Sequence, residues 1–295
     1  MRLPLSLYAI TLALVAAPLS SQNLVTNGDF EGGTNPNGLP KGWTFSGYAL
    51  AQQLSKVDVT GGGASNSFNC RPGGKQLPTP YPPNNMDQNV VLIQGVVHEF
   101  RADIASVANN GNADGGTFEV FVDGVSAGKH LFGRITLQTT ERTRLCLRIV
   151  PKVSGSKVLR ITFHRRYLNT TGTPVCAIDN IFFGRTQGPT VCFPGERLAG
   201  TAVNISAFGT AGSRFGIFVS AKNTTPYPIS SWTGQWALAN PFVPLVIGTL
   251  NDTRGEWHLS PSVPASAKGV KIWLQGIQVT TTNLHLGFAQ EVNIY

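Results

Sequence analysis

Apolar and polar residues alternate in short runs along most of the chain, and this period of two predicts β-strands with one buried face. No stretch shows the sustained 3.6-residue period of an amphipathic helix. The clearest runs cover residues 98–106, 116–124, 143–150 and 158–166. Their apolar members are expected to face a core, and they are Phe100, Ala102, Ile104, Phe118, Val120, Val122, Leu145, Leu147, Ile149, Leu159, Ile161 and Phe163.

The last two of these runs have basic polar faces. They are joined by the turn sequence PKVSGSK, which predicts a β-hairpin. The hairpin would gather five basic side chains on one face, namely Arg144, Arg148, Arg160, His164 and Arg166. Acidic residues on the polar faces of other strands, such as Glu99, Asp103 and Glu119, are available to neutralise them.

The alternating runs continue beyond a break rich in Gly, Pro and Thr at residues 184–195. Strands are expected at residues 214–222, 234–239, 244–250, 256–260, 269–279 and 284–295. Turn residues separate them at short intervals, as in a β-sandwich. The chain is therefore predicted to be all-β, with two β-sandwich domains at residues 23–187 and 192–295.

Residues 1–22 have the pattern of a secretory signal peptide. Arg2 precedes an apolar run that extends to about Ala17, and small residues follow it. The run is shorter than the roughly 20 residues of a membrane-spanning helix. We therefore expect a secreted protein, outside the cell or at its surface, without a membrane span.

The positive charge is concentrated in the first expected domain. The chain has a net charge of +8, and residues 23–187 hold 16 Lys or Arg against 11 Asp or Glu, whereas residues 192–295 hold 6 against 4. A basic surface is compatible with nucleic acid, but export argues against it as a partner. An anionic polysaccharide fits both the charge and the expected location.

The cysteines Cys70, Cys146, Cys176 and Cys192 are an even set in a chain expected to be exported. This favours two disulfides over free thiols. Three pairings are possible, and the sequence does not choose among them. Their spacing is not that of a zinc site.

Two motifs about 150 residues apart indicate a family. NLVTNGDFEGG at residues 23–33 is followed by a Gly-Trp segment, GLPKGWTFSG, and CAIDNIFFG closes the unit at residues 176–184. Together they resemble jelly-roll carbohydrate-binding modules of cellulases and xylanases, and the related galactose-binding-like domains. The resemblance covers residues 23–185 and implies a jelly roll whose first strand turns Phe30 into the core. The C-terminal half resembles β-sandwich repeats of uncharacterised secreted bacterial proteins.

The same resemblance implies a structural Ca²⁺ site where the first and last strands meet. Its matching side chains are Glu31 and Asp179, with Asp29 as an additional candidate. Backbone carbonyls would supply further oxygen ligands, because Ca²⁺ takes six to eight. The alternative is that Asp29 and Glu31 are ordinary turn carboxylates.

The basic hairpin has two interpretations. In one it is a salt-bridged, solvated sheet face of little energetic weight. In the other it is a groove for an acidic polysaccharide, because the planar Arg side chain donates two parallel hydrogen bonds to a carboxylate or sulfate. Aromatic residues that stack on sugar rings would complete such a groove, and the candidates are Phe121, Tyr81 and Tyr167.

No sequence motif indicates catalysis: the chain lacks GxSxG, HExxH and a phosphate-binding glycine loop. We therefore expect a non-catalytic protein that binds a polysaccharide or surface glycan through its first domain. One alternative is a structural matrix protein at the cell surface. The other is an enzyme like the jelly-roll polysaccharide lyases, with Arg160, His164 and Tyr167 as its reactive groups.

Overall fold

The structure, a computed structural model, describes residues 23–47, 52–61, 63–72, 83–109, 111–165, 173–186, 188–193, 199–251, 255–281 and 283–294. Within these ranges the regular elements are β-strands and a single 3₁₀ turn at Ala265–Ala267, with no α-helix. No helix in the described ranges is long and apolar enough to cross a membrane. The expected signal peptide, residues 1–22, lies outside the described residues.

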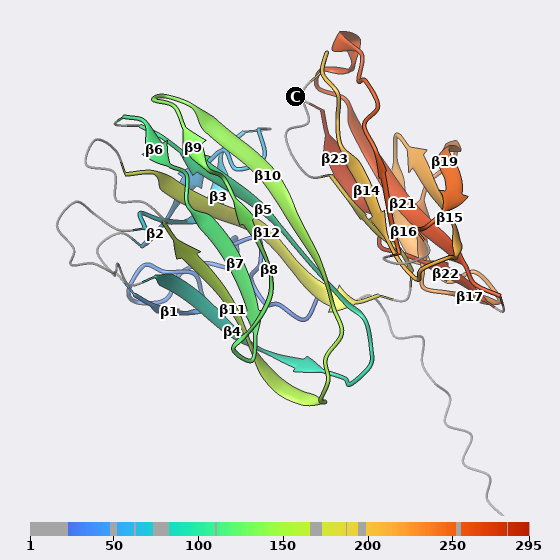
Figure 1. The fold of residues 1–295 in the computed structure, drawn as a ribbon, viewed down its shortest axis with the longest axis horizontal. Helices are drawn as coiled ribbons and strands as arrows, with labels where there is room; N and C mark the ends of the chain where they lie inside the picture. Colours follow the sequence, from blue (N-terminus) through green and yellow to red (C-terminus); the bar gives the residue numbers. More distant parts are fainter. Residues whose placement is uncertain are drawn as a thin grey trace, which may run out of the picture.

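The strands form two β-sandwiches that lie side by side (Figure 1). The first sandwich consists of two five-stranded sheets, which we call the β11 sheet and the β5 sheet. The β11 sheet has the order β1 (Thr44–Ser46), β4 (Asn84–Leu92), β11 (Gly155–His164), β7 (Thr117–Val122) and β8 (Val125–Leu131). The β5 sheet has the order β10 (Thr140–Ile149), β5 (His98–Val107), β12 (Val175–Arg185), β3 (Ser65–Cys70) and β2 (Gln53–Val57). A separate two-stranded ribbon pairs β6 (Ala113–Asp114), which follows β5 in the sequence, with β9 (Arg134–Ile135), which precedes β10.

The core of the first sandwich is filled by the apolar faces that the alternating runs predict. Phe100, Phe118 and Phe163 have no exposed surface, and the rings of Phe118 and Phe163 meet edge to face with centroids 4.9 Å apart. Burying a side chain of this size contributes about 1.5–3 kcal/mol. The predicted all-β jelly-roll sandwich is therefore confirmed at the level of strands and faces.

The motif NLVTNGDFEGG does not form the strand expected of it. Residues 23–33 are a series of turns held to the end of β12: Leu24 N–H donates to Phe183 O at 2.7 Å, and Ile181 N–H donates to Gly28 O at 2.8 Å. Gly28 is required there, because a Cβ would lie 2.1 Å from Ile181 O. Phe30 is nevertheless fully buried, as predicted.

The expected β10–β11 hairpin is wrong. Strand β10 pairs with β5, whereas β11 pairs with β4 and β7 in the opposite sheet. The turn between them therefore carries the chain from one sheet to the other, and Leu145 on β10 and Leu159 on β11 enter the same core from opposite sides. A period of two specifies which face of a strand is buried, but it does not specify the sheet that the strand joins.

The second sandwich packs a three-stranded sheet on a larger one. The smaller sheet has the order β13 (Thr190–Cys192), β14 (Ile205–Phe208) and β20 (Glu256–Leu259). The larger sheet has the order β17 (Trp232–Thr233), β22 (Leu284–Leu286), β21 (Lys271–Val279), β15 (Arg214–Ser220) and β19 (Phe242–Thr249). Strand β23 (Gln290–Asn293) also pairs with β21. A separate two-stranded ribbon consists of β16 (Asn223–Tyr227) and β18 (Trp236–Leu238). Its core includes Ile205, Phe215, Ile217 and Leu274.

Candidate functional site

The second sandwich contacts the outer face of the β5 sheet through charged residues of β5 and β10. The register places Arg144 opposite Asp103 and Arg148 opposite Glu99. Opposite charges that face each other on adjacent strands stabilise a sheet. Arg144 makes two hydrogen bonds to Asp103, and its third nitrogen donates to Gln290 Oε1 of the second sandwich at 3.5 Å.

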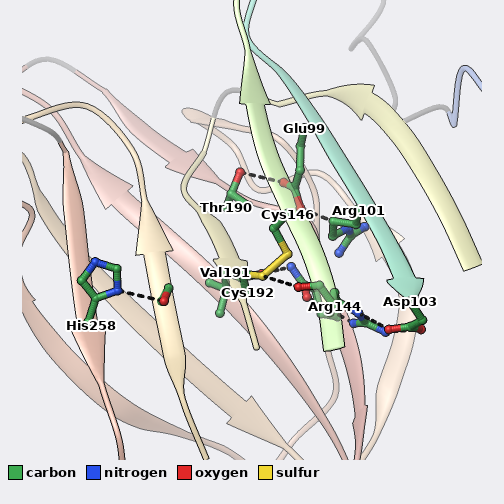
Figure 2. The surroundings of a disulfide bond; sticks show 11 residues. Glu99, Arg101, Asp103, Arg144, Cys146, Thr190, Val191, Cys192 and His258 are labelled. Atoms are coloured by element: carbon green, nitrogen blue, oxygen red, sulfur yellow. Dashed lines mark hydrogen bonds and ion pairs between the residues drawn. A yellow bond between two sulfur atoms is a disulfide. The ribbon is translucent and has the colours of Figure 1, made fainter. Parts of the chain in front are cut away.

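A disulfide and further polar contacts join the same surfaces (Figure 2). Cys146 on β10 is bonded to Cys192 on β13. Arg148 donates to the carbonyl oxygens of Gly188 and Phe208 at 3.4 and 3.3 Å. The two sandwiches are therefore linked covalently and by hydrogen bonds.

Glu99 is buried at this contact with no exposed surface. The Thr190 hydroxyl donates to it at 2.9 Å, and Arg101 Nε lies 3.1 Å from its other oxygen. Burial raises the pKa of Glu99, and the nearby Arg101 opposes that rise. The Arg101 guanidinium in turn stacks over the ring of Phe182, 4.4 Å from the centroid.

These contacts correct the predicted basic face. Arg144 and Arg148 lie between the sandwiches, on a different sheet from Arg160 and His164, so the structure does not bring the four together. The face is salt-bridged, as one interpretation expected, but it is not solvated. Periodicity alone could not reveal that a second sandwich covers it.

The outer face of the β11 sheet is the exposed polar face of the first sandwich. Two neighbouring rows of residues cross this sheet by register. One row consists of Ser46, Asn85, Thr162, Glu119 and Lys129, and the other consists of Thr44, Asp87, Arg160, Phe121 and Ser126. We call these ten residues the sheet-face rows.

Hydrogen bonds within the sheet-face rows fix their polar groups. Arg160 makes two hydrogen bonds to Asp87, at 2.8 and 2.7 Å, and Asp87 raises the pKa of this guanidinium. In the other row Thr162 donates to Asn85 Oδ1 at 2.9 Å, and Asn85 donates to Ser46 at 3.2 Å. The result is an ordered array of donors and acceptors on a solvent-facing sheet.

Phe121 is the apolar member of the sheet-face rows, and its half-buried ring lies opposite Arg160 in the register. Beside it, Glu119 accepts a hydrogen bond from Ser126 at 2.7 Å and lies 3.6 Å from His164 Nε2. The structure therefore brings three predicted ligand residues, Phe121, Arg160 and His164, to one sheet. Of the other five, Arg144 and Arg148 lie between the sandwiches, and Tyr81, Arg166 and Tyr167 lie outside the described residues.

Sequence reasoning missed the polar partners on β1 and β4. Asn85 and Asp87 are two residues apart in the run NNMDQNVVL, which alternates with the buried Met86. That alternation was a usable signal for an outward polar row. The pairing of Asp87 with Arg160, however, depends on β4 lying next to β11, and local periodicity does not contain this information.

The candidate calcium ligands lie at the start of β3. The Ser65 hydroxyl donates to Asp179 Oδ2 at 2.6 Å, and Asn66 donates to Glu31 Oε2 at 2.6 Å. The consecutive residues Ser65 and Asn66 therefore hold the carboxylates of Asp179 and Glu31 by hydrogen bonds. Burial, followed by the charges of Asp103 and Glu31, raises the pKa of Asp179 to about 7.

Asp29 has a different position. Its carboxylate accepts the Glu31 N–H at 3.3 Å, a contact that shapes the turn. Among the described residues, no three His, Cys, Asp or Glu side chains gather in a metal-binding group. A calcium ion at Glu31 and Asp179 would therefore depend on backbone oxygens for most of its ligands.

A serine and a histidine meet in the second sandwich, but they do not form an accessible nucleophile. Ser206 Oγ lies 2.9 Å from Nδ1 of His258, and His258 Nε2 lies 3.6 Å from Glu256 (Figure 2 shows His258 and its hydrogen bond). Ser206 is only 4% exposed. Its hydroxyl links β14 to β20 beneath the surface.

Comparison with known proteins gives matches in structure. No family model matches the chain, and no curated protein matches its sequence. A solved structure of TmCBM61 with β-1,4-galactotriose is similar at 15% identity and a TM-score of 0.34, covering 56% of this chain and 99% of that one.

Two further similar structures are carbohydrate-binding modules. The CBM22-1–CBM22-2 tandem of Paenibacillus barcinonensis Xyn10C is 12% identical with a TM-score of 0.36, and the match covers 94% of this chain and 99% of that one. A CBM4 structure is 12% identical with a TM-score of 0.32, covering 55% of this chain and 99% of that one. All three belong to the class that the N-terminal motifs resemble.

Proposed function

We propose that this protein is a secreted, non-catalytic module that binds a polysaccharide or surface glycan on the outer face of the β11 sheet. The observation that carries the proposal is the combination found in the sheet-face rows. Ordered hydroxyl, amide and carboxylate groups lie in the same two rows as the partly exposed ring of Phe121. Sugars need this combination, because their hydroxyls exchange hydrogen bonds and their ring faces stack on aromatic side chains.

The position of the second sandwich supports the choice of face. It covers the outer side of the β5 sheet through the contacts of Arg144, Arg148 and Glu99. The β11 sheet is on the opposite side of the same core, and its outer residues Thr44, Ser126 and Arg160 are exposed. An extended glycan chain therefore has access to this face rather than to the other.

The internal ion pairs favour a hydroxyl-rich glycan over a strongly anionic one. The expected anionic preference depended on unpaired arginines gathered on one face. Arg160 is instead neutralised by Asp87, and Arg142 is paired with Asp58 on the other side of the sandwich. Because the attraction to an anion is reduced by these carboxylates, we propose that binding has a weak dependence on salt.

A glycan array probed with the full chain at about 0.05 M and about 0.5 M NaCl tests this proposal. We expect binding to at least one neutral polysaccharide, with little change between the two salt concentrations. Binding that is restricted to uronate or sulfated glycans and lost at high salt would reverse the proposed preference. Failure to bind any polysaccharide would favour a structural matrix protein, and release of unsaturated products would indicate a lyase.

We also propose that Glu31 and Asp179 hold a structural Ca²⁺ ion. Two carboxylates, held by the consecutive residues Ser65 and Asn66, supply oxygen donors of the kind that this cation prefers. The ion would connect the N-terminal turns to β12. Asp29 is proposed only as a residue that orients Glu31 through the 3.3 Å hydrogen bond to its N–H.

A further inference from the structure

Two cysteines that the structure holds as thiols lie directly opposite each other in the first sandwich. Cys70 is the last residue of β3, Cys176 is the second residue of β12, and the antiparallel register pairs them. Directly opposed residues of antiparallel strands project to the same side of a sheet. Here that side is the core, and neither side chain has any exposed surface.

The backbone at this position suits a disulfide. Directly opposed residues in antiparallel strands have Cα atoms about 4.5 or 5.5 Å apart, depending on the hydrogen-bonding pattern. Disulfides span Cα separations of about 4.4–6.8 Å, so either pattern lies within range. The disulfide present between Cys146 and Cys192 spans 6.2 Å.

Oxidation of Cys176 would not leave the carbonyl oxygen of Gly115 without a hydrogen-bond donor. The Cys176 thiol donates weakly to Gly115 O at 3.5 Å, and the Ser106 hydroxyl donates to the same oxygen at 2.6 Å. Gly115 O therefore keeps its stronger donor when the S–H is lost. The neighbouring Gly116 has no side chain to occupy this space, and a Cβ there would lie 3.1 Å from Cys176 Sγ.

The environment makes both thiols slow to react. Burial raises the pKa of Cys176 to about 12. Burial, and then the charge of Cys176, raises the pKa of Cys70 well above its usual value. The thiolate is the reactive form, so both thiols react slowly while the sandwich stays folded. The absence of exposed surface would also shield a bond formed here from external thiols.

We propose that Cys70 and Cys176 are a cross-strand disulfide site that closes when the protein is in an oxidising compartment. When the sandwich opens enough to admit it, a low-molecular-weight disulfide such as oxidised glutathione is attacked by one cysteine, which forms a mixed disulfide and releases one glutathione thiol. The second cysteine attacks the protein sulfur of the mixed disulfide and releases the other. Two protein thiols are oxidised, one glutathione disulfide is reduced to two thiols, and the two thiol protons pass to the released glutathione.

The test equilibrates the full chain in glutathione buffers from fully reduced to fully oxidised until the number of thiols stops changing. Samples are quenched in acid, denatured without reductant and alkylated with N-ethylmaleimide, and peptides are mapped by mass spectrometry. We expect the adducts on Cys70 and Cys176 to disappear in oxidising buffer and a peptide pair joining these residues to appear. The proposal is overturned if both adducts persist at equilibrium, if glutathione stays attached to either cysteine, or if either is linked to Cys146 or Cys192.

A second measurement separates this disulfide from the one between the sandwiches. In wild type, the difference in melting midpoint between oxidised and reduced protein reports both bonds, whereas in Cys70→Ala/Cys176→Ala it reports Cys146–Cys192 alone. We expect the larger difference in wild type, and equal differences would overturn the proposal. Should the double variant not fold, the peptide map of the wild-type chain decides the result. Neither measurement involves a glycan, so the outcome does not depend on the proposed function.

Discussion

Arg144 and Asp103 face each other across β10 and β5 and are joined by hydrogen bonds of 2.8 and 2.9 Å. The Asp103 side chain is 1% exposed and that of Arg144 is 14% exposed. Asn180 donates a further hydrogen bond to Asp103 at 3.1 Å. This ion pair is buried because the second sandwich covers it, and it belongs to the contact between the two sandwiches.

Removing the arginine of this pair is expected to destabilise the protein strongly. Arg144→Ala leaves the Asp103 carboxylate buried without its counter-charge, which typically costs about 3–5 kcal/mol. Arg160→Ala is the matched control, because Arg160 makes the same kind of pair with Asp87 but its side chain is 44% exposed. The control should lose less than about 1 kcal/mol. Urea denaturation of both variants measures the difference, and equal losses would contradict the burial argument.

The ring of Phe121 is expected to carry much of the glycan affinity. Phe121→Ala removes the partly exposed ring in the sheet-face rows. We expect the dissociation constant to rise roughly tenfold, equivalent to a loss of about 1.4 kcal/mol of binding free energy. Phe242→Ala is the control, since Phe242 is an exposed phenylalanine of the second sandwich at 38% exposure. Calorimetric titration with a polysaccharide identified on the array makes the comparison. If Phe242→Ala reduces affinity and Phe121→Ala does not, the binding face lies on the second sandwich.

Removal of calcium is expected to lower the melting temperature. Without the cation, burial and the charge of Glu31 disfavour the ionised form of Asp179, and the turns at residues 23–33 lose an anchor to β12. Calorimetry with and without a chelator, together with metal analysis of the purified protein, measures this effect. Asp179→Asn should melt at the same temperature in both buffers. An unchanged wild-type melting curve and the absence of bound calcium would refute the site.

His98 is expected to make the protein sensitive to mild acid. Its ring is buried, Nδ1 lies 2.9 Å from Val96 O, and burial lowers its pKa from the usual value of 6.5. The unfolded chain therefore binds a proton at a higher pH than the folded protein does. Stability is kept above about pH 6.5 and is lost as the pH falls below that value.

Substitution of this histidine tests the assignment. His98→Leu removes the titrating group, so the free energy of unfolding should depend less on pH between about 5 and about 7 than it does in wild type. Chemical denaturation at several pH values measures this dependence. An identical pH dependence in the variant would show that other groups control the acid response.

The sequence predicted the faces of the strands more accurately than their partners. Alternation correctly assigned the buried positions of β5, β7 and β11, such as Ile104, Val120 and Ile161. The pairing of β10 with β11 was wrong because the same five-residue connection can close a hairpin or cross between sheets. The sequence pattern indicated that Glu99 and Asp103 are solvated, whereas both are buried in the structure. The prediction failed because periodicity carries no information about what packs on the outer face of a sheet.

The buried charges between the sandwiches have a mechanical consequence. Any rotation of one sandwich about the other would expose or mismatch Glu99, Asp103 and Arg148 while the Cys146–Cys192 bond holds a nearby point fixed. Rotation would break the hydrogen bonds that Glu99 and Arg148 make to the second sandwich, and hydrogen bonds to charged groups contribute about 1.5–3 kcal/mol each, so such a rotation is opposed. The orientation of the second sandwich therefore determines the direction in which the β11 sheet presents its outer face.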